Sequence, residues 1–193
     1  MHETDDYRAK AWEHLTQTID PMVKKAGWAV QWMLGDQDNP SFSYTIGLSA
    51  KQLPELLITL PIEPELARYI LNNVAKTFIK LGSAAAGDLH QVLEGLPVRV
   101  SFIDMSAFAQ FGKVAVAWAQ YRRIFLNQAM QVILSDEYGN FPGDDAYAWV
   151  PQLVLPGPQT QNQKKKRKPN GTCLRSLCLM SGLYEAVVAH ESP

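Results

Sequence analysis

The sequence predicts an α+β fold: a mostly antiparallel sheet of about five strands with two main helices packed on it. Three observations predict this class. Several short stretches alternate apolar and polar residues, as strands do. Two longer stretches repeat apolar residues at helical spacing. Short, turn-rich links join the early strands. With 193 residues and a hydrophobic fraction of 47%, the chain is long enough to bury one core.

The first expected element is an amphipathic helix over residues 7–19. Its apolar side chains, such as Trp12 and Leu15, recur at helical spacing. Pro21 is expected to break or kink this helix, and Gly27 to end the segment.

Three strands should follow as an antiparallel meander with short links, at residues 28–34, 42–48 and 55–60. The next helix should span residues 64–81, because Pro64 suits its first turn and Gly82 its end. Its stripe comprises Leu66, Ile70, Val74, Phe78 and Leu81. Residues 83–96 hold small residues and two glycines, which favours a loop or a short helix.

The second half predicts a strand at 98–103, a helix at 107–126 and a strand at 129–135. We therefore assign residues 1–155 to one α+β domain with an N-terminal helix, and expect both main helices on one face of the sheet. Residues 156–172 are rich in Pro, Gln and Lys and predict a flexible basic linker. Residues 173–193 regain an apolar stripe, which predicts a C-terminal amphipathic helix docked on its own domain or on a partner.

Charge is unevenly distributed along the chain. The run Lys164–Lys168 supplies five of the 18 Lys and Arg residues, and without it 13 positive charges face 19 negative ones, a net charge of −6. An acidic body argues against a broad nucleic-acid-binding face and favours a basic partner. The basic run itself is either a solvated linker segment, a small phosphate-binding site or a nuclear-localisation signal.

The chain is expected to be cytoplasmic. The N-terminus is acidic and lacks the apolar run of a signal peptide, and no stretch is apolar enough to span a membrane. Cys173 and Cys178 are the two cysteines, too few and too close together for a disulfide framework. The alternative is delivery to a host-cell nucleus, if Lys164–Lys168 is a localisation signal.

From about residue 27 to residue 155, the chain resembles the bacterial family called domain of unknown function 4262. The matching pieces are Gly27-Trp28, Tyr44-Thr45-Ile46-Gly47-Leu48, Pro54-Glu55-Leu56-Leu57, Leu71-Asn72, Gln131-Val132 and Asp136-Glu137-Tyr138-Gly139-Asn140-Phe141-Pro142. Gly143 stands where such proteins usually have Trp. The resemblance implies a fold and no particular activity.

The candidate ligand-binding residues in the early strands are Tyr44, Thr45, Gly47 and Glu55. The small polar face of the strand around Thr45 would let a ligand approach the backbone, or it is simply half-solvated. Glu55 enters an apolar strand, where a carboxylate either bonds a neighbouring turn or serves as an acid/base group.

The second group of candidates lies after the last strand, at Asp136, Gly139 and Phe141. With Asp144 and Asp145 nearby, Asp136 would either contribute oxygen ligands to a hard cation or form an Asx-type turn. The four histidines and two cysteines have no metal-ligand spacing, so no metal is predicted.

Three functions from different classes stay open. The first is a protein-binding or regulatory, immunity-like module, since no catalytic motif is recognisable. The second is an enzyme or nucleotide-binding protein with a site around Thr45, Glu55 and Asp136. The third is a small-molecule binder similar to the flavin-holding split barrels. The sequence indicates no particular cofactor and no oligomeric state.

Overall fold

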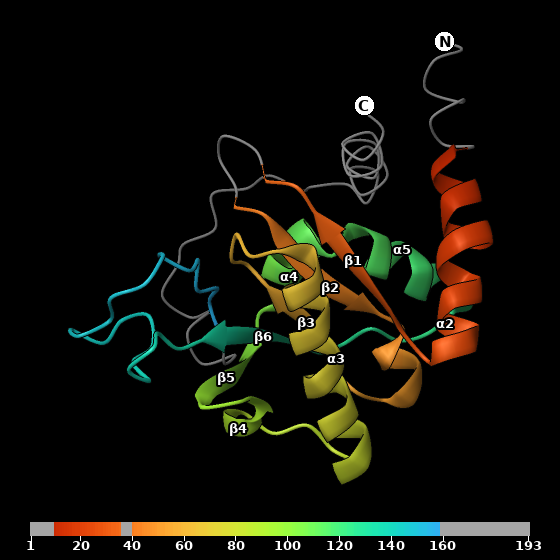
Figure 1. Cartoon of the computed structure of the whole chain (residues 1–193). Helices are drawn as coiled ribbons and strands as arrows, with labels where there is room; N and C mark the ends of the chain where they lie inside the picture. The colour runs from red at the N-terminus through yellow and green to blue at the C-terminus, as the bar shows by residue number, and fades with distance from the viewer. Residues whose placement is uncertain (1–9, 36–39, 159–193) are drawn as a thin grey trace, which may run out of the picture.

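The structure, a computed structural model, describes residues 10–35 and 40–158 and contains a six-stranded mixed sheet (Figure 1). The strand order is β1-β2-β3-β6-β5-β4. The strands are β1 (Ala29–Met33), β2 (Phe42–Ile46), β3 (Glu55–Ile58), β4 (Gly87–Leu93), β5 (Leu96–Ile103) and β6 (Ala129–Leu134). The predicted α+β class and the five predicted strands are confirmed.

The sheet is antiparallel except where β3 pairs with β6 in parallel. The first three strands form the predicted meander. The sheet is open, with β1 and β4 at its ends, and does not close like a split barrel.

Strand β4 was not expected, because residues 83–96 were assigned to a loop or a short helix. It is an edge strand with mostly exposed side chains, and Val92 is the one fully buried side chain in it. An edge strand of this kind lacks the apolar alternation by which strands are recognised.

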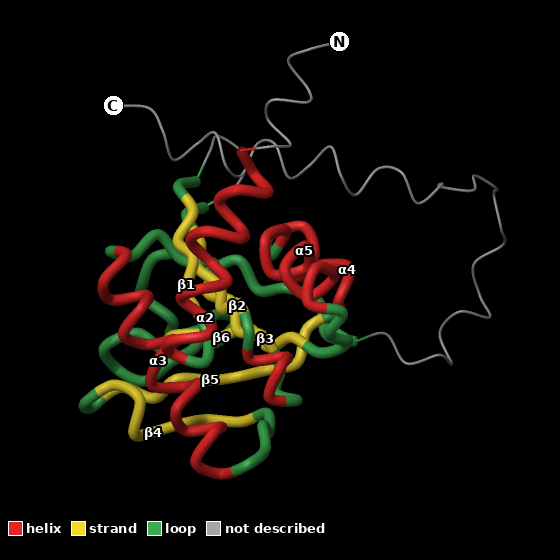
Figure 2. The backbone as a smooth tube through the Cα atoms, turned by 90° about the vertical axis from the view of Figure 1, so that its right-hand side faces the viewer, coloured by secondary structure: helices red, strands yellow, loops and turns green. Residues whose placement is uncertain are grey.

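The helices cover both faces of the sheet, and the expectation that both main helices share one face is wrong. Helix α3 (Pro64–Leu81), with the bounds that the sequence predicts, packs on one face, and α4 (Met105–Phe111) and α5 (Lys113–Arg122) pack on the other (Figures 1 and 2). Alternate residues of a strand point to opposite faces of the sheet, so each central strand contributes side chains to two cores.

We call these cores the α3-side core and the α5-side core. The α3-side core includes Leu56, Ile58, Ile70, Val74, Phe78, Val98, Val100, Met130, Val132 and Leu134. The α5-side core includes Leu15, Ile19, Tyr44, Ile46, Leu57, Ile103, Phe108, Phe111, Trp118 and Ala129. The central strands are therefore buried on both sides.

The N-terminal helix continues through Pro21, where the sequence predicts a break or a kink, so there is no break. A wide turn, η1 (His14–Ile19), leads directly into α2 (Asp20–Ala26), and Pro21 lies in the first turn of α2, where a missing N–H costs little. Gly27 ends the helix in a left-handed conformation, as predicted.

The helix expected at residues 107–126 is divided at Gly112. A Cβ on Gly112 would lie 2.5 Å from the ring of Phe108, so the chain passes too close to this ring for a side chain. Asp104 caps α4 by accepting a hydrogen bond from the backbone N–H of Ser106 at 2.8 Å.

After β6, the chain forms a loop and then crosses back over the sheet. We call residues 135–148 the Asp136 loop and residues 149–158 the strap. The described part of the chain includes no helix that is both long and apolar enough to cross a membrane. The linker predicted at residues 156–172 begins within the strap, where the carbonyl of Pro156 accepts a hydrogen bond from the N–H of Asp104 at 2.9 Å. Residues 159–172 of that linker and the predicted helix at 173–193 lie outside the described residues.

Candidate functional site

Glu55 is the first residue of β3, and its buried carboxylate accepts hydrogen bonds from neighbouring groups of the protein. Its Oε1 accepts hydrogen bonds from the backbone N–H of Gly47 (2.9 Å), the N–H of Ser49 (2.9 Å) and the Ser49 hydroxyl (2.8 Å), and its Oε2 accepts one from the Thr45 hydroxyl (2.7 Å). Burial raises the pKa of the Glu55 carboxyl, and the donors from Ser49, Thr45 and Gly47 act in the opposite direction.

The Thr45 hydroxyl makes two hydrogen bonds within the protein: it donates to Glu55, and it accepts from the N–H of Leu56 at 2.8 Å. Thr45 and Glu55 are both buried, so together they hold the turn between β2 and β3 against β3. The half-solvated face expected for β2 is wrong, since helices cover the sheet on both sides.

Gly47 allows a close approach, but the approaching group belongs to the protein. Its φ is +111°, and a Cβ would lie 2.6 Å from Cγ1 of Val23 on α2. Tyr44 points into the α5-side core, where its ring stacks on Phe42 with 6.1 Å between centroids. Burial raises the pKa of the Tyr44 phenol far above its ordinary value.

Asp136 organises the loop that follows β6. Its carboxylate accepts hydrogen bonds from the backbone N–H groups of Tyr138 (3.0 Å), Asn140 (2.8 Å) and Ala148 (3.0 Å). Burial raises the pKa of Asp136, but the hydrogen bonds from Ala148, Asn140 and Tyr138 outweigh burial and hold the pKa below its ordinary value. The bond from Tyr138 is the predicted Asx-type turn.

The other loop candidates are also structural. Gly139 has φ +86° and donates its N–H to the carbonyl of Asp136 at 3.1 Å. Phe141 is buried beneath the guanidinium of Arg99, 3.8 Å from its ring centroid. Among residues 10–35 and 40–158, no group of three or more His, Cys, Asp or Glu side chains is arranged to hold a metal ion, so the hard-cation alternative is not supported.

The structure therefore separates the candidates into two groups. Glu55 lies opposite Ala129 at the start of β6, whereas Asp136 follows the end of β6. At about 3.3 Å per strand residue, roughly 20 Å separates the two carboxylates. Thr45 and Glu55 come together, and Asp136 does not join them.

Two glutamines that hold the strap were not among the predicted site residues. Gln131 on β6 is fully buried, and its side-chain amide donates to Thr59 Oγ1 (2.7 Å) and to the carbonyl of Leu153 (2.5 Å). Its Oε1 accepts a hydrogen bond from the N–H of Leu155 at 2.8 Å. Two signals were available: Gln131 is a polar residue inside an otherwise apolar strand, and Gln131-Val132 is one of the pieces that carry the family resemblance.

Gln152 holds the strap to the far end of β6. Its side chain accepts from the N–H of Leu134 (3.1 Å) and donates to the carbonyl of Val132 (2.9 Å). Strand β3 ends before this point, so the Gln152 amide takes the place of the missing strand partner. Hydrogen bonds from two glutamine side chains thus hold the strap backbone on the sheet.

The strap carries large apolar side chains that are partly exposed. Trp149, Val150, Leu153 and Val154 are 40%, 46%, 43% and 48% exposed. Just before them, Glu137, Asp144 and Asp145 are exposed in the Asp136 loop. We call these seven side chains the loop–strap surface. No Lys or Arg occurs between residues 124 and 158.

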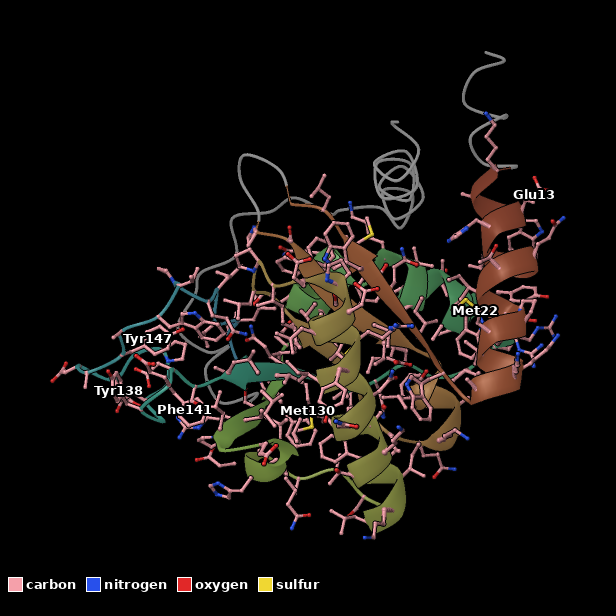
Figure 3. All side chains as sticks on the ribbon, viewed as in Figure 1. Glu13, Met22, Met130, Tyr138, Phe141 and Tyr147 are labelled. Atoms are coloured by element: carbon pink, nitrogen blue, oxygen red, sulfur yellow. The ribbon has the colours of Figure 1, made fainter. Side chains whose placement is uncertain are left out.

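The loop–strap surface lies at one end of the molecule. In Figure 1 the Asp136 loop projects beyond the end of β6, on the side away from α2. Figure 3 places Tyr138, Phe141 and Tyr147 of this loop far from Glu13 and Met22 of the N-terminal helix. The Tyr147 hydroxyl donates to the carbonyl of Val150 at 2.8 Å, which joins the loop to the strap.

The fold and these contacts define a mixed α+β domain whose buried polar residues tie its turns, its loop and its strap to a central sheet. The family model described as "Domain of unknown function (DUF4262)" matches residues 22–148, and the chain belongs to that family. The resemblance expected from the sequence is confirmed. No curated protein and no solved structure matches the chain.

The family match has a structural counterpart. It begins in α2, includes the whole sheet and ends with the Asp136 loop. Two of its motifs meet directly, since Trp28 Nε1 donates to Asn72 Oδ1 at 2.8 Å and joins the start of β1 to α3. The strap, and the chain that follows it, lie outside the match.

Proposed function

We propose that this protein is a protein-binding module, and that the loop–strap surface receives the partner. The observation that carries the proposal is a strap held by hydrogen bonds whose exposed apolar side chains are next in sequence to the exposed carboxylates of the Asp136 loop. Arg99 of β5 lies over Phe141 in this loop and interacts with Asp144, so Glu137 and Asp145 are the carboxylates left to attract a partner. Exposed apolar groups that a rigid scaffold holds in place are typical of docking surfaces, because little entropy is lost when they bind.

The chemistry of the surface defines the partner. Trp149 and Leu153 offer large apolar contacts, and Trp is among the residues that contribute most to binding. Glu137 and Asp145 favour Lys or Arg at the rim of the partner. The partner is therefore a protein segment that carries apolar side chains beside basic ones.

The acidity of this surface is local. The described residues carry 11 Lys and Arg against 12 Asp and Glu, a net charge of −1, so the described body is nearly neutral. The more acidic body that the sequence suggested includes residues outside the described part. Attraction to a basic partner thus depends on the loop–strap surface and not on the overall charge.

Affinity capture from the source cells tests the proposal. The full chain is immobilised alongside Leu153→Asp and Val154→Asp, and Tyr69→Asp serves as the control because Tyr69 is a 56% exposed apolar residue on α3. We expect the wild type and the Tyr69 variant to capture the same partner protein. Both strap variants should capture about tenfold less of it or even less, because each places an unpaired charge in the buried interface.

Crosslinking of the captured protein then locates the contact. The crosslinked peptide should contain Lys or Arg beside apolar residues, and raised salt should weaken capture. Circular dichroism confirms that each variant is folded. Capture that does not depend on Leu153 and Val154, or a crosslinked peptide that is acidic, would overturn the proposal.

A further inference from the structure

The chain itself carries a segment with the chemistry that the loop–strap surface recognises. The run Lys164–Lys168 consists of five consecutive basic residues. It is followed by an apolar stripe at helical spacing: Leu174, Leu177, Tyr184, Val187 and Val188. Basic residues next to an apolar stripe are the complement of exposed carboxylates next to an apolar row.

The point of attachment keeps this segment close to the surface. The described chain ends at Pro158, at the end of the strap itself. Lys164 follows six residues later, within about 20 Å of extended chain. Leu174 follows Pro158 by 16 residues, and the contour length of such a chain limits how far it can lie from the strap. A tether of this length raises the effective concentration of the segment at the loop–strap surface.

The other groups of exposed apolar side chains suit a basic segment less well, because of their charge or because they lack the short tether. At the start of α3, the exposed Leu66 and Tyr69 lie near the exposed Glu63 and Glu65, but this place is not joined to the C-terminal segment by a short tether. The exposed Leu81 at the end of α3 follows Lys80. At the end of α5, the exposed Tyr121 and Phe125 flank Arg122 and Arg123, and Trp12 packs against Tyr121 with 5.1 Å between ring centroids. Like charges would repel Lys164–Lys168 from the ends of α3 and α5.

We propose that residues 164–188 bind in cis to the loop–strap surface, with Lys164–Lys168 near its carboxylates and the apolar stripe over Leu153 and Val154. This inference rests on the proposed function, because the cis segment and the partner share one surface. A partner must then displace the segment, so the C-terminal segment is an autoinhibitor whose release controls binding.

The two native cysteines make the contact measurable in the full chain. Cys173 and Cys178 lie in the C-terminal segment, and residues 1–172 contain no other cysteine. A new cysteine at Val154 can form a disulfide with one of them when their Cα atoms come within about 7 Å. Val154→Cys is therefore combined with Cys173→Ser or with Cys178→Ser, so that one native thiol remains.

Under mild oxidation we expect an intramolecular disulfide in the Val154→Cys chain, seen as loss of free thiol in a monomer on non-reducing gels. The matched control is Tyr69→Cys, which places an exposed cysteine on α3 beside Arg68. The Val154 disulfide should form about tenfold faster than the control, because the tether and a specific contact both favour it. The contribution of the contact is the part of this rate that raised salt removes from the same Val154→Cys chain, since salt screens charge pairing and leaves the tether unchanged. Equal rates would overturn the inference, and a disulfide-linked dimer would show that a second copy is the occupant.

Replacing all five residues of Lys164–Lys168 with Glu tests the charge contribution. This variant should form the Val154 disulfide several-fold more slowly and should capture more partner than the wild type. An unchanged disulfide rate would contradict the charge pairing.

The two proposals fail in different ways. If no partner depends on Leu153 in the wild type or in the Glu variant, the proposed function is wrong while the disulfide still decides the cis contact. If a partner depends on Leu153 and the Val154 disulfide is no faster than the control, the cis contact is wrong and the proposed function stands.

Discussion

Two buried carboxylates, those of Glu55 and Asp136, accept the hydrogen bonds that hold the turns next to β3 and β6. Glu55 begins an apolar strand and Asp136 follows one. Such positions are typical of catalytic groups and of turn-forming groups alike. Backbone N–H groups and hydroxyls surround both of them. The number of such donors depends on the path of the neighbouring chain, which local sequence does not specify.

Asp20 is a third buried carboxylate, and it supports a prediction about pH. Its Oδ2 lies 2.7 Å from Nζ of Lys24, and its Oδ1 accepts from Trp118 Nε1 at 3.2 Å and lies 3.6 Å from Nε of Arg122. Burial raises the pKa of Asp20, but Lys24, Trp118 and Arg122 together hold it below the ordinary value of 3.8. The contacts join α2 to α5.

Because the folded-state pKa of Asp20 is lowered, its contribution is present above the unfolded pKa and is lost as the pH falls through the folded pKa. We expect Asp20→Asn to reduce the free energy of unfolding by about 2 kcal/mol at pH 7, since charged hydrogen bonds to a buried group are lost. The difference from wild type should shrink below about pH 4. Urea unfolding at several pH values measures it.

Glu13→Gln is the control for Asp20→Asn, because Glu13 is an exposed carboxylate on the same helical segment. It should change stability by less than about 0.5 kcal/mol. A loss for Asp20→Asn that is constant from pH 7 to pH 3 would show that the charge of Asp20 is not the stabilising feature.

At the scale of elements, the strap depends on amide side chains and not on strand pairing. Gln152→Ala removes the partner of the Leu134 N–H and of the Val132 carbonyl. We expect a loss of about 1–3 kcal/mol in the free energy of unfolding, because two backbone groups lose their partner in a buried place. Hydrogen exchange at the Leu134 amide should accelerate more than exchange elsewhere in β6.

Gln91→Ala on the edge strand β4 is the matched control, since Gln91 is exposed. It should leave both stability and Leu134 exchange nearly unchanged. Unaltered exchange at Leu134 in Gln152→Ala would mean that the strap stays in place without the amide.

Helices and strands with a strong apolar repeat were predicted well. Elements whose existence or bounds depend on contacts with other parts of the chain were not. The bounds of α3 agree with the sequence because its stripe, its first-turn Pro64 and its terminal Gly82 all indicate the same helix. Strand β4 has few buried side chains, so its existence depends on pairing with β5. The break at Gly112 depends on the ring of Phe108, a contact that the apolar repeat does not reveal.

At the scale of the whole molecule, one sheet joins two cores, and this arrangement predicts cooperative unfolding. Phe78 is buried in the α3-side core and Phe108 in the α5-side core. Phe78→Ala and Phe108→Ala should each lower the free energy of unfolding by about 3–4 kcal/mol. Both should shift a single transition, because losing either core exposes the sheet that the other core needs.

Coincident urea transitions by tryptophan fluorescence and far-ultraviolet circular dichroism would support this prediction, with Tyr69→Ala as an exposed control on α3. Two separate transitions, or a Phe108→Ala variant that alters one probe alone, would show that the two faces of the sheet unfold independently.

The sequence by itself determined the α+β class, the five strongly patterned strands and the bounds of α3, because periodic burial and terminal Pro or Gly residues act locally. Its motifs, separately, determined the family resemblance. Only the tertiary structure decided which face each helix covers, that Glu55 and Asp136 lie at opposite ends of β6, and that Gln131 and Gln152 fix the strap. These features depend on contacts between residues far apart in the chain. The pattern within any one segment carries no information about its partner.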